Sequence, residues 1–331
     1  MRILITGGAG FIGSNFARFV LSKEEPESVI IVDKLSTGRI ENISQLLSDP
    51  RLKFFQCDLT KDFSLLDFIF RRCSPRIIFH FAAEAHVDES IRNPLIASSN
   101  FLMTNILLEK AREYGVEKFF HISTDEVYGP IPSGFADESY PLNPSSPYSA
   151  SKAASDLLCL AYFKTYKVPV IITRCTNNFG PYLDVRRLTA RHITNALLGY
   201  ELPIWDGGGQ VRDWLFVEDH CSALWLLLEK GKIGEIYNIA GGNLLRNIEV
   251  AEAILRLIPE SKSKIVLRGS RPAHDIRYAL NADKIKELGW EPRYKFEEAL
   301  KMTIEWYKKN EHWWREKKRE IEEEFYKSLG R

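Results

Sequence analysis

The sequence predicts an α/β protein in which a doubly wound parallel sheet is followed by a smaller, mixed α/β lobe. Apolar runs of strand length alternate with segments of helical period through residues 1–175, as is typical of a parallel sheet covered by helices. A glycine-rich turn directly follows the first of these runs. After Cys175 the alternation loosens, and Gly, Pro and Trp become more frequent. At 331 residues the chain is long enough for one large core with a subsidiary lobe.

The large sheet accounts for the first domain, residues 1–175. Its expected strands are Ile3–Ile5, Val29–Val32, Leu52–Gln56, Ile77–Phe81, Phe119–Ser123 and Val170–Thr173. Strands that are apolar throughout are typical of a sheet with helices on both faces. Long helices with an apolar face are expected at 94–114 and 147–166.

Residues 176–331 are assigned to the second lobe. Its expected strands are Trp214–Val217 and Glu235–Ile239, either of which is a candidate to rejoin the first sheet. Its expected helices lie near 186–199, 219–230, 247–257 and 295–309. From Asn310 the chain is strongly charged, with a sparse apolar stripe formed by Trp313, Trp314, Ile321 and Phe325. We expect a solvated terminal helix docked by these side chains, the alternative being a partner-binding helix.

Charge and cysteine content narrow the classes of function. With 45 basic and 44 acidic residues the net charge is +1, so no general attraction to nucleic acid or to an anionic membrane is expected. The five cysteines have no CxxC or Cys/His spacing, which argues against a zinc site or a disulfide framework. No apolar run approaches the roughly 18 residues of a membrane span, and no cleavage-site pattern follows the first strand. A reducing cytoplasm is the expected location.

The opening RILITGGAGFIGS favours a dinucleotide-binding turn. Gly7, Gly10 and Gly13 lie between a strand and a helix, where backbone N–H groups and the helix dipole can approach a pyrophosphate. The next strand ends at Asp33, twenty residues after Gly13, where a carboxylate can bind both ribose hydroxyls of adenosine. This acid would repel a 2′-phosphate, so we expect NAD. The nearby Lys34 and Arg39 leave NADP as a minor alternative.

A catalytic group is predicted at PYSASK. Tyr148 and Lys152 are four residues apart at the start of an expected helix, so their side chains share one face. A nearby ammonium lowers the pKa of a phenol and makes it a general base for an alcohol. The stretch HISTDEVYG ends an apolar strand with Thr124, Asp125 and Glu126. Two adjacent acids raise one another's pKa, which suggests a chemical task for the loop.

Taken together, GGAGFIG, DEVYG, YSASK and RDWLFVED resemble the extended short-chain dehydrogenase/reductase superfamily over nearly the whole chain up to about residue 300. Within it, STDEVYG, TNNFGPY and RPAHD most resemble the dTDP-glucose 4,6-dehydratase family. The resemblance implies oxidation of hexose C4 by bound NAD, loss of water across C5–C6, and return of the hydride to C6. Tyr148 would take the C4 hydroxyl proton beside Thr124, Glu126 the C5 proton, and Asp125 would protonate the departing hydroxyl.

The resemblance also assigns binding positions. For the cofactor these are Gly7, Gly10, Phe11, Ile12, Gly13, Asp33, Lys34, Leu35, Ser36, Asp58, Leu59, Phe81, Ala82, Ala83, Ala85, Ser99, Tyr148, Lys152 and Asn178. For the nucleotide sugar they are Ala85, His86, Thr124, Asn177, Arg187, Leu188, Pro203, Ile204, Trp205, Arg212, Asn247, Arg271 and His274. The family usually has serine where this chain has Ala85, and glycine where it has Ala273. Read without the resemblance, Asp58 is as well explained as a cap on the end of its strand.

Other functions remain open at this point. A UDP-glucose 4,6-dehydratase would carry the same residues. The resemblance also implies a homodimer that forms through the two long helices at 94–114 and 147–166. A UDP-sugar 4-epimerase or a UDP-glucuronate decarboxylase needs Tyr148 and Lys152 but has no use for an acid beside a base. A non-catalytic sensor of dinucleotide redox state would keep the glycines and be free to lose Tyr148, Lys152 and the acids.

Overall fold

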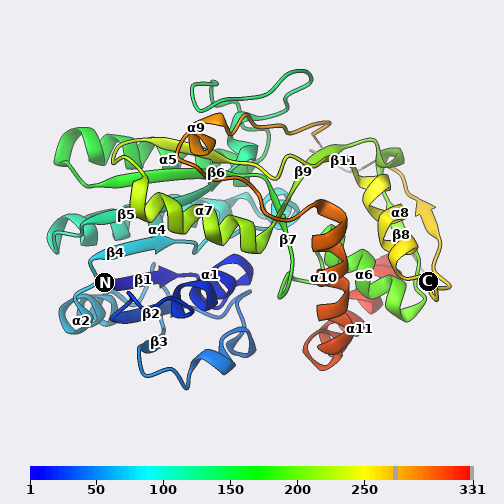
Figure 1. Ribbon diagram of the computed structural model, residues 1–331, viewed down its shortest axis with the longest axis horizontal. Helices are drawn as coiled ribbons and strands as arrows, with labels where there is room; N and C mark the ends of the chain where they lie inside the picture. Colours follow the sequence, from blue (N-terminus) through cyan, green and yellow to red (C-terminus); the bar gives the residue numbers. More distant parts are fainter. Residues whose placement is uncertain (271–274, 329–331) are drawn as a thin grey trace.

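A seven-stranded parallel sheet forms the centre of the molecule in the computed structural model, which describes residues 1–270 and 275–328 (Figure 1). The strand order is β10-β6-β5-β4-β1-β2-β3, and every pairing is parallel. The strands are β1 (Arg2–Thr6), β2 (Ser28–Asp33), β3 (Leu52–Gln56), β4 (Ile77–His80), β5 (Lys118–Thr124), β6 (Val170–Cys175) and β10 (Ile236–Ile239). The predicted doubly wound α/β class is confirmed.

Helices cover both faces of this sheet. Alternate residues of a strand point to opposite faces, so Ile3 and Ile5 pack in one buried cluster and Leu4 in another. The first cluster is covered by α1 (Phe11–Leu21) and α7 (Val217–Lys230). The second is covered by α2 (Phe63–Cys73), α4 (Pro94–Glu113) and α5 (Pro147–Tyr166). Burial on both sides explains why these strands are apolar throughout.

The strand order reverses between β1 and β4, which places a crevice at the carboxyl ends of these two strands. The chain leaves β1 into the glycine-rich turn and leaves β4 into residues 81–86, which lead to α3 (Val87–Arg92). A Cβ atom at Gly7 would lie 2.7 Å from the backbone nitrogen of Ala82. The two segments therefore touch, and only glycine fits where they meet.

The second lobe contains two small sheets beside the large one (Figure 1). One joins β7 (Asn177–Phe179), β9 (Val211–Phe216) and β11 (Leu244–Arg246), and the other joins β8 (Leu202–Ile204) and β12 (Ile265–Leu267). Its helices are α6 (Leu188–Leu198), α8 (Asn247–Leu257), α10 (Phe296–Lys309) and α11 (Glu311–Ser328), whereas α9 (Asp283–Lys286) packs against β10 of the large sheet. Short 3₁₀ helices lie at Ile40–Asn42, Ser44–Leu46, Asp125–Tyr128 and Asp206–Gly208.

The two strands named as candidates to rejoin the large sheet differ. The strand β10 joins the large sheet by pairing with β6. The strand β9 belongs to the three-stranded sheet, so the prediction that the strand near 214–217 could join the large sheet is wrong. The edge of β6 is occupied by β10, and β9 pairs instead with β7, the strand that follows β6 in the chain.

The terminal helix α11 docks through its tryptophans. Trp314 is 1% exposed, and its ring N–H donates to the carbonyl of Tyr307 at 2.8 Å. The ring N–H of Trp313 donates to Asn42 Oδ1 at 2.8 Å, and Arg39 Nη1 donates to the Trp313 carbonyl at 2.8 Å. These bonds tie the end of the chain to the segment after β2. The side chain of Phe325 lies outside the described residues. Within the described part of the chain, no helix is long and apolar enough to cross a membrane.

Candidate active site

The glycine-rich turn has the close backbone approach that a pyrophosphate site requires. Gly7 has φ +68°, and a Cβ at Gly13 would lie 2.3 Å from the Gly7 carbonyl oxygen. The helix α1 begins at Phe11, so its first backbone N–H groups point back to this turn. A side chain on these glycines would fill the cradle, and the turn therefore fits a dinucleotide.

Asp33, at the end of β2, is held by this turn. Its two carboxylate oxygens accept from the backbone N–H groups of Ala9 (3.0 Å) and Leu35 (2.8 Å). Burial raises the pKa of Asp33, and these hydrogen bonds oppose that rise. Each oxygen keeps a second lone pair for a ribose hydroxyl. The adjacent Lys34 is paired with Glu84 at 2.5 Å, so its charge is engaged within the protein.

The remaining cofactor positions lie in the loops and helices around the crevice. Phe81 packs against Phe16 of α1, and the backbone nitrogen of Ala82 bonds to Thr6. Ser99 lies on α4, where its hydroxyl donates to the Ile96 carbonyl. Of the remaining assigned residues, two lie in elements: Ile12 on α1 and Asn178 on β7. The other three follow strands: Ser36 after β2, Leu59 after β3 and Ala83 after β4.

Asp58 lies after β3, with one oxygen accepting from both the backbone and the hydroxyl of Thr60, at 3.0 and 2.7 Å. These bonds form a turn at the end of the strand. Asp58 therefore does cap the end of its strand, and its contact with adenine stays a prediction.

The predicted catalytic loop, Thr124 to Tyr128, begins at the last residue of β5. Thr124 is the N-cap of the 3₁₀ helix Asp125–Tyr128, and its hydroxyl accepts from the Glu126 backbone N–H at 3.3 Å. The same hydroxyl donates to Asp125 Oδ1 at 3.1 Å. Successive side chains of a 3₁₀ helix point about 120° apart, so the two acids are directed differently. Asp125 is 3% exposed, whereas Glu126 is half-buried.

This difference in burial sets the protonation of Asp125. Burial and the neighbouring charge of Glu126 raise the pKa of Asp125 to about 8. Its second oxygen, Oδ2, is buried without a hydrogen-bond partner among the described residues. Asp125 is therefore a protonated carboxylic acid at neutral pH, with a donor available for a bound molecule.

Tyr148 and Lys152 lie on the first turns of α5, which begins with a capping box at Ser146 and a proline at the first helical position. Both side chains are buried. Lys152 Nζ donates to the Ile122 carbonyl at 2.7 Å, which fixes the ammonium beside β5. The backbone nitrogen of Tyr148 donates to Ser90 of α3 at 3.3 Å.

The pKa of Tyr148 does not follow the expectation from Lys152 alone. Burial, followed by the charge of Glu126, raises this pKa. Arg187 lowers it, and Asp125 raises it further. A buried phenol near the carboxylate of Glu126 resists ionisation, so a base at this position depends on every positive charge near it. Arg187 brings one such charge from the second lobe.

The residues assigned to the diphosphate and sugar approach the crevice from the second lobe. Arg187 Nη2 donates to the Ala85 carbonyl at 2.6 Å, and Arg186 Nη2 lies 2.9 Å from His86 Nε2. Burial and then the nearby arginines lower the pKa of His86 to about 3, so this ring is neutral. The loop after β4 and the loop before α6 are thereby joined across the cofactor crevice.

Arg212 lies at the other side of the catalytic loop. It donates to the carbonyl of Asp275 at 2.8 Å and stacks over the Tyr278 ring, 4.4 Å from its centroid. Its charge opposes the rise in the pKa of Asp125, which places it near that acid. Asp213 accepts from the Gly242 and Asn243 backbone and is not its hydrogen-bond partner.

The positions assigned to the base form a separate cluster around β8. The Pro203 carbonyl faces His192 Nε2 at 3.1 Å, Ile204 is buried, and the Arg191 guanidinium lies 5.7 Å from the Trp205 ring centroid. Leu188 begins α6 beside this cluster. The side-chain oxygens of Asn177 and Asn247 are buried without hydrogen-bond partners among the described residues, as expected of groups that bind a ligand. Arg271 and His274 lie outside the described residues.

Sequence reasoning missed the side chains behind Lys152. His121, Asp156 and Arg174 are buried there as a polar cluster. The spacing of Lys152 and Asp156, four residues apart on one helix, was the available signal.

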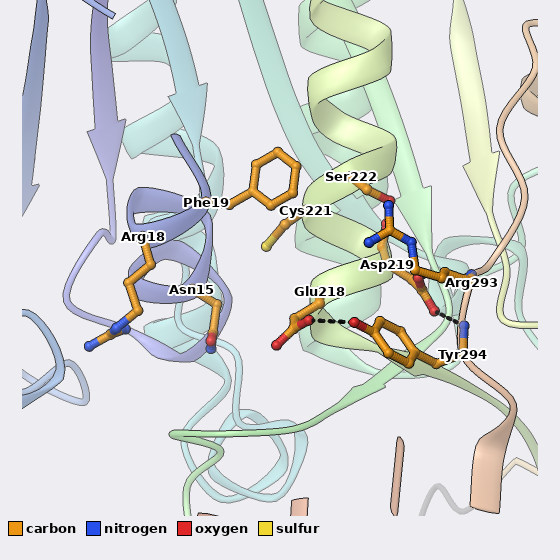
Figure 2. Close-up of a pocket in the computed structure, with 9 residues that line it drawn as sticks. All are labelled: Asn15, Arg18, Phe19, Glu218, Asp219, Cys221, Ser222, Arg293 and Tyr294. Carbon is orange, nitrogen blue, oxygen red and sulfur yellow. Dashed lines mark hydrogen bonds between the residues drawn. The ribbon is translucent and has the colours of Figure 1, made fainter. Parts of the chain in front are cut away.

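A separate hollow of about 240 Å³ lies between α1 and α7, and no residue assigned to the site lines it (Figure 2). In it, Asp219 accepts from the backbone N–H groups of Arg293 and Tyr294, at 2.9 and 3.2 Å. Asp219 closes the run RDWLFVED, so the last acid of that motif holds the chain before α10. Among the described residues, no group of three or more His, Cys, Asp or Glu side chains could hold a metal ion.

Comparisons with known proteins agree on one group of enzymes. The family described as GDP-mannose 4,6 dehydratase matches residues 4–303. A dTDP-glucose 4,6-dehydratase from Escherichia coli is 43% identical over 95% of each chain, and a low-salt glycan biosynthesis protein from Haloferax volcanii is 42% identical over 93% of this chain and 98% of its own.

Solved structures extend the similarity to the fold. A dTDP-glucose 4,6-dehydratase from Streptomyces venezuelae, solved with NAD and dTDP bound, has a TM-score of 0.90 at 42% identity, covering 95% of this chain and 99% of its own. A UDP-glucose 4-epimerase from Thermotoga maritima has a TM-score of 0.87 at 32% identity, covering 93% and 99%.

Proposed function

This chain belongs to the family described as GDP-mannose 4,6 dehydratase, within the short-chain dehydrogenase/reductase superfamily, and we propose that it is an NAD-dependent dTDP-glucose 4,6-dehydratase. Its relatives with that name span nearly all of both chains. The observation that carries the proposal is the pair Asp125 and Glu126, in which one acid is buried and protonated and its neighbour is half-buried. An elimination of water needs an acid and a base together, and this loop supplies both.

The first step oxidises C4 of the hexose. The chemistry that a bound NAD would supply is a hydride acceptor for C4 and a hydride donor for C6. The glycine turn at Gly7 and the carboxylate of Asp33 are the groups that fit this cofactor. Tyr148 removes the C4 hydroxyl proton, Thr124 hydrogen-bonds the same oxygen, and the ammonium of Lys152 favours the phenolate.

The second step removes water across C5 and C6. The ketone at C4 acidifies the C5 hydrogen, and Glu126 takes this proton. Asp125, protonated at neutral pH, gives its proton to the C6 hydroxyl as that group leaves as water. Return of the hydride to C6 and return of the proton from Glu126 to C5 then give dTDP-4-keto-6-deoxy-glucose.

Charged and polar groups of the second lobe hold the nucleotide. Arg187 and Arg212 are the described residues assigned to the diphosphate, where a planar guanidinium suits phosphate oxygens. The buried oxygens of Asn177 and Asn247 support the assignment of these amides to the nucleotide sugar. Trp205, whose ring has the Arg191 guanidinium over it, is the aromatic side chain assigned to the base.

A 4-epimerase is the second candidate, because 4-epimerases share this fold. It would oxidise C4 and leave the C6 hydroxyl in place. Mass spectrometry after incubation with dTDP-glucose separates the two: a product lighter by one water is expected, and an isobaric product or no product would contradict the proposal. Turnover of dTDP-, UDP-, CDP- and GDP-glucose under the same conditions tests the base, with dTDP-glucose expected to be preferred.

The assembly that we propose is a cytoplasmic homodimer. Apolar side chains are exposed on the packed helices α4 and α5, among them Leu95 (82% exposed) and Leu157 (57%). Exposed apolar side chains that gather on two packed helices are typical of a protein–protein interface. All five cysteines are free and buried, as suits a reducing compartment. Light scattering of Leu157→Glu, expected to be monomeric, tests the interface, and an unchanged mass would contradict it.

A further inference from the structure

Four buried side chains form a polar chain that leads away from Lys152 into the protein. Lys152 Nζ lies 3.4 Å from His121 Nε2, and that nitrogen lies 3.4 Å from Asp156 Oδ1. Arg174 Nε donates to the other oxygen, Asp156 Oδ2, at 2.9 Å. The Arg174 guanidinium lies over the ring of Tyr128, 4.7 Å from its centroid. None of these side chains is more than a few per cent exposed.

The register of β5 and β6 brings these groups together. His121 and Ser123 of β5 share a face because they are two residues apart, and Ser123 pairs with Arg174 of β6. Asp156 follows Lys152 by four residues on α5, so both lie on the helix face that packs against these strands. The helix α5 thus supplies Lys152 and Asp156, and the strands β5 and β6 supply His121 and Arg174.

One nitrogen of His121 stands between two charged groups. As an acceptor, Nε2 takes a hydrogen bond from the Lys152 ammonium, and as a donor it gives one to Asp156. Burial, and then the charge of Lys152, lowers the pKa of His121 to about 4, so the ring is neutral and the two arrangements are its two tautomers. In either tautomer Nε2 makes only one of these two hydrogen bonds, so His121 is an uncharged spacer that lies between the ammonium and the carboxylate.

Asp156 is the anion of this cluster. Its pKa is lowered although burial acts to raise it, because the hydrogen bond to His121 and the charge of Arg174 outweigh burial. Burial lowers the pKa of Lys152, and the charge of Asp156 opposes this. A buried cation without a compensating anion is strongly disfavoured, so the ammonium depends on Asp156.

The other titratable groups around Lys152 cannot replace Asp156. Burial raises the pKa of Cys159, of Cys175 (to about 12) and of Tyr128 (to about 12), so all three are neutral. Burial lowers the pKa of His80, which contacts Thr6 and Thr104, so this ring is also uncharged. From the end of β5, Asp125 is protonated and Glu126 faces Tyr148.

We propose that Asp156 and His121 are positioning residues that hold the Lys152 side chain as an ammonium beneath Tyr148. The proposal rests on the proposed function, in which that ammonium favours the Tyr148 phenolate. Arg174 fixes the carboxylate from behind and leaves its second oxygen directed towards His121. Neither Asp156 nor His121 is assigned a contact with substrate or cofactor.

The test is the pH profile of dTDP-glucose turnover by Asp156→Asn, an isosteric change that removes the charge. Without that charge Lys152 loses its proton at a lower pH, and the Tyr148 phenol loses its cation. We expect kcat at pH 7 to fall about tenfold with KM unchanged, and the acidic limb of the profile to move about one pH unit upward. The variant should regain activity towards the wild-type value at alkaline pH.

Two further variants separate positioning from a merely structural role. Asp219→Asn removes another buried carboxylate, the one that caps the backbone at residues 293 and 294, and should leave the pH profile in place. His121→Phe keeps a ring beside His80, whose centroid is 5.6 Å away, and removes the ring nitrogen Nε2, so its acidic limb should move in the same direction as that of Asp156→Asn. If Asp156→Asn does not fold, His121→Phe decides.

The outcomes are distinguishable from failure of the proposed function. Absence of dehydration by the wild-type protein overturns the function itself. Wild-type turnover combined with an unshifted acidic limb in the folded variants overturns only the positioning role of Asp156 and His121. A downward shift of the acidic limb overturns it too, because it would mean that Lys152 keeps its charge without Asp156.

Discussion

Two buried aspartates on either side of the Tyr148–Lys152 pair have opposite protonation states. Asp125, at the end of β5, has a pKa of about 8, whereas the pKa of Asp156, on α5, is lowered. Burial raises both. Asp125 has a hydroxyl and another acid for neighbours, and Asp156 has a histidine and a directly bonded arginine. The comparison teaches that the partners of a buried acid decide whether it acts as a proton donor or as a fixed charge.

The largest effect is expected at the residue between the two aspartates. Tyr148→Phe removes the hydroxyl that we propose takes the C4 proton, so the first oxidation should fall by about three orders of magnitude or more. Stopped-flow absorbance of the reduced cofactor measures this step. Rapid cofactor reduction in the variant would remove Tyr148 from its role as the base.

Effects of similar size are expected for Asp125→Asn and Glu126→Gln, and they distinguish the proposed acid from the proposed base. Asp125→Asn keeps the shape of the protonated acid but has no proton to give, so dehydration should fall by about 10² to 10⁴ while C5 exchange persists. Glu126→Gln should still permit C4 oxidation and should lose C5 exchange. NMR of the sugar recovered from heavy water measures the exchange. Equal loss of exchange in both variants would contradict separate roles.

The opposite pKa shifts predict opposite effects on stability. Asp125 has a folded pKa above its ordinary value of 3.8, so its contribution to stability is lost as the pH rises towards about 8. Asp125→Asn should therefore stabilise the protein near pH 7, on the order of 3 kcal/mol. Asp156 contributes stability above pH 3.8, which is lost as the pH falls. Asp156→Asn should destabilise at pH 7 by about 3 kcal/mol, because Arg174 is left unpaired.

Urea unfolding at pH 5, 7 and 8 measures both changes. The gain from Asp125→Asn should grow with pH over this range, because folding of the wild-type chain must protonate an acid that is ionised in the unfolded chain. Destabilisation by Asp125→Asn at pH 8 would show that the folded protein does not hold this acid protonated.

The smallest effect is expected at the outer end of the Asp156 cluster. Tyr128→Phe removes the hydroxyl that donates to Asn238 Oδ1 at 2.8 Å and keeps the ring beneath Arg174. Stability should fall by about 1 to 2 kcal/mol, because the buried acceptor loses its donor. The pH profile of turnover should not move. A shifted profile would extend the set of positioning residues beyond the charged groups.

Much of this molecule could be read from local sequence. The strand Leu52–Gln56 and the helix at 247–257 have the predicted bounds, since the apolar period and the turn residues that fix them are local. Gly7 and Asp33 could be assigned because a glycine turn and a strand-end acid have a fixed spacing in one βαβ unit. The strand β9 was misplaced as a candidate for the large sheet, since edge pairing depends on where the preceding and following segments pack.

By itself the sequence determined the fold class, the cofactor turn, and the presence of a tyrosine, a lysine and two adjacent acids. It could not determine which acid carries the proton, because a 3₁₀ turn buries Asp125 and leaves Glu126 half-buried. Nor could it bring His121, Asp156 and Arg174 together, since their contact depends on the register of β5 with β6 and on the face that α5 presents. Protonation follows from burial and from neighbours distant in sequence, and these exist only in the folded chain.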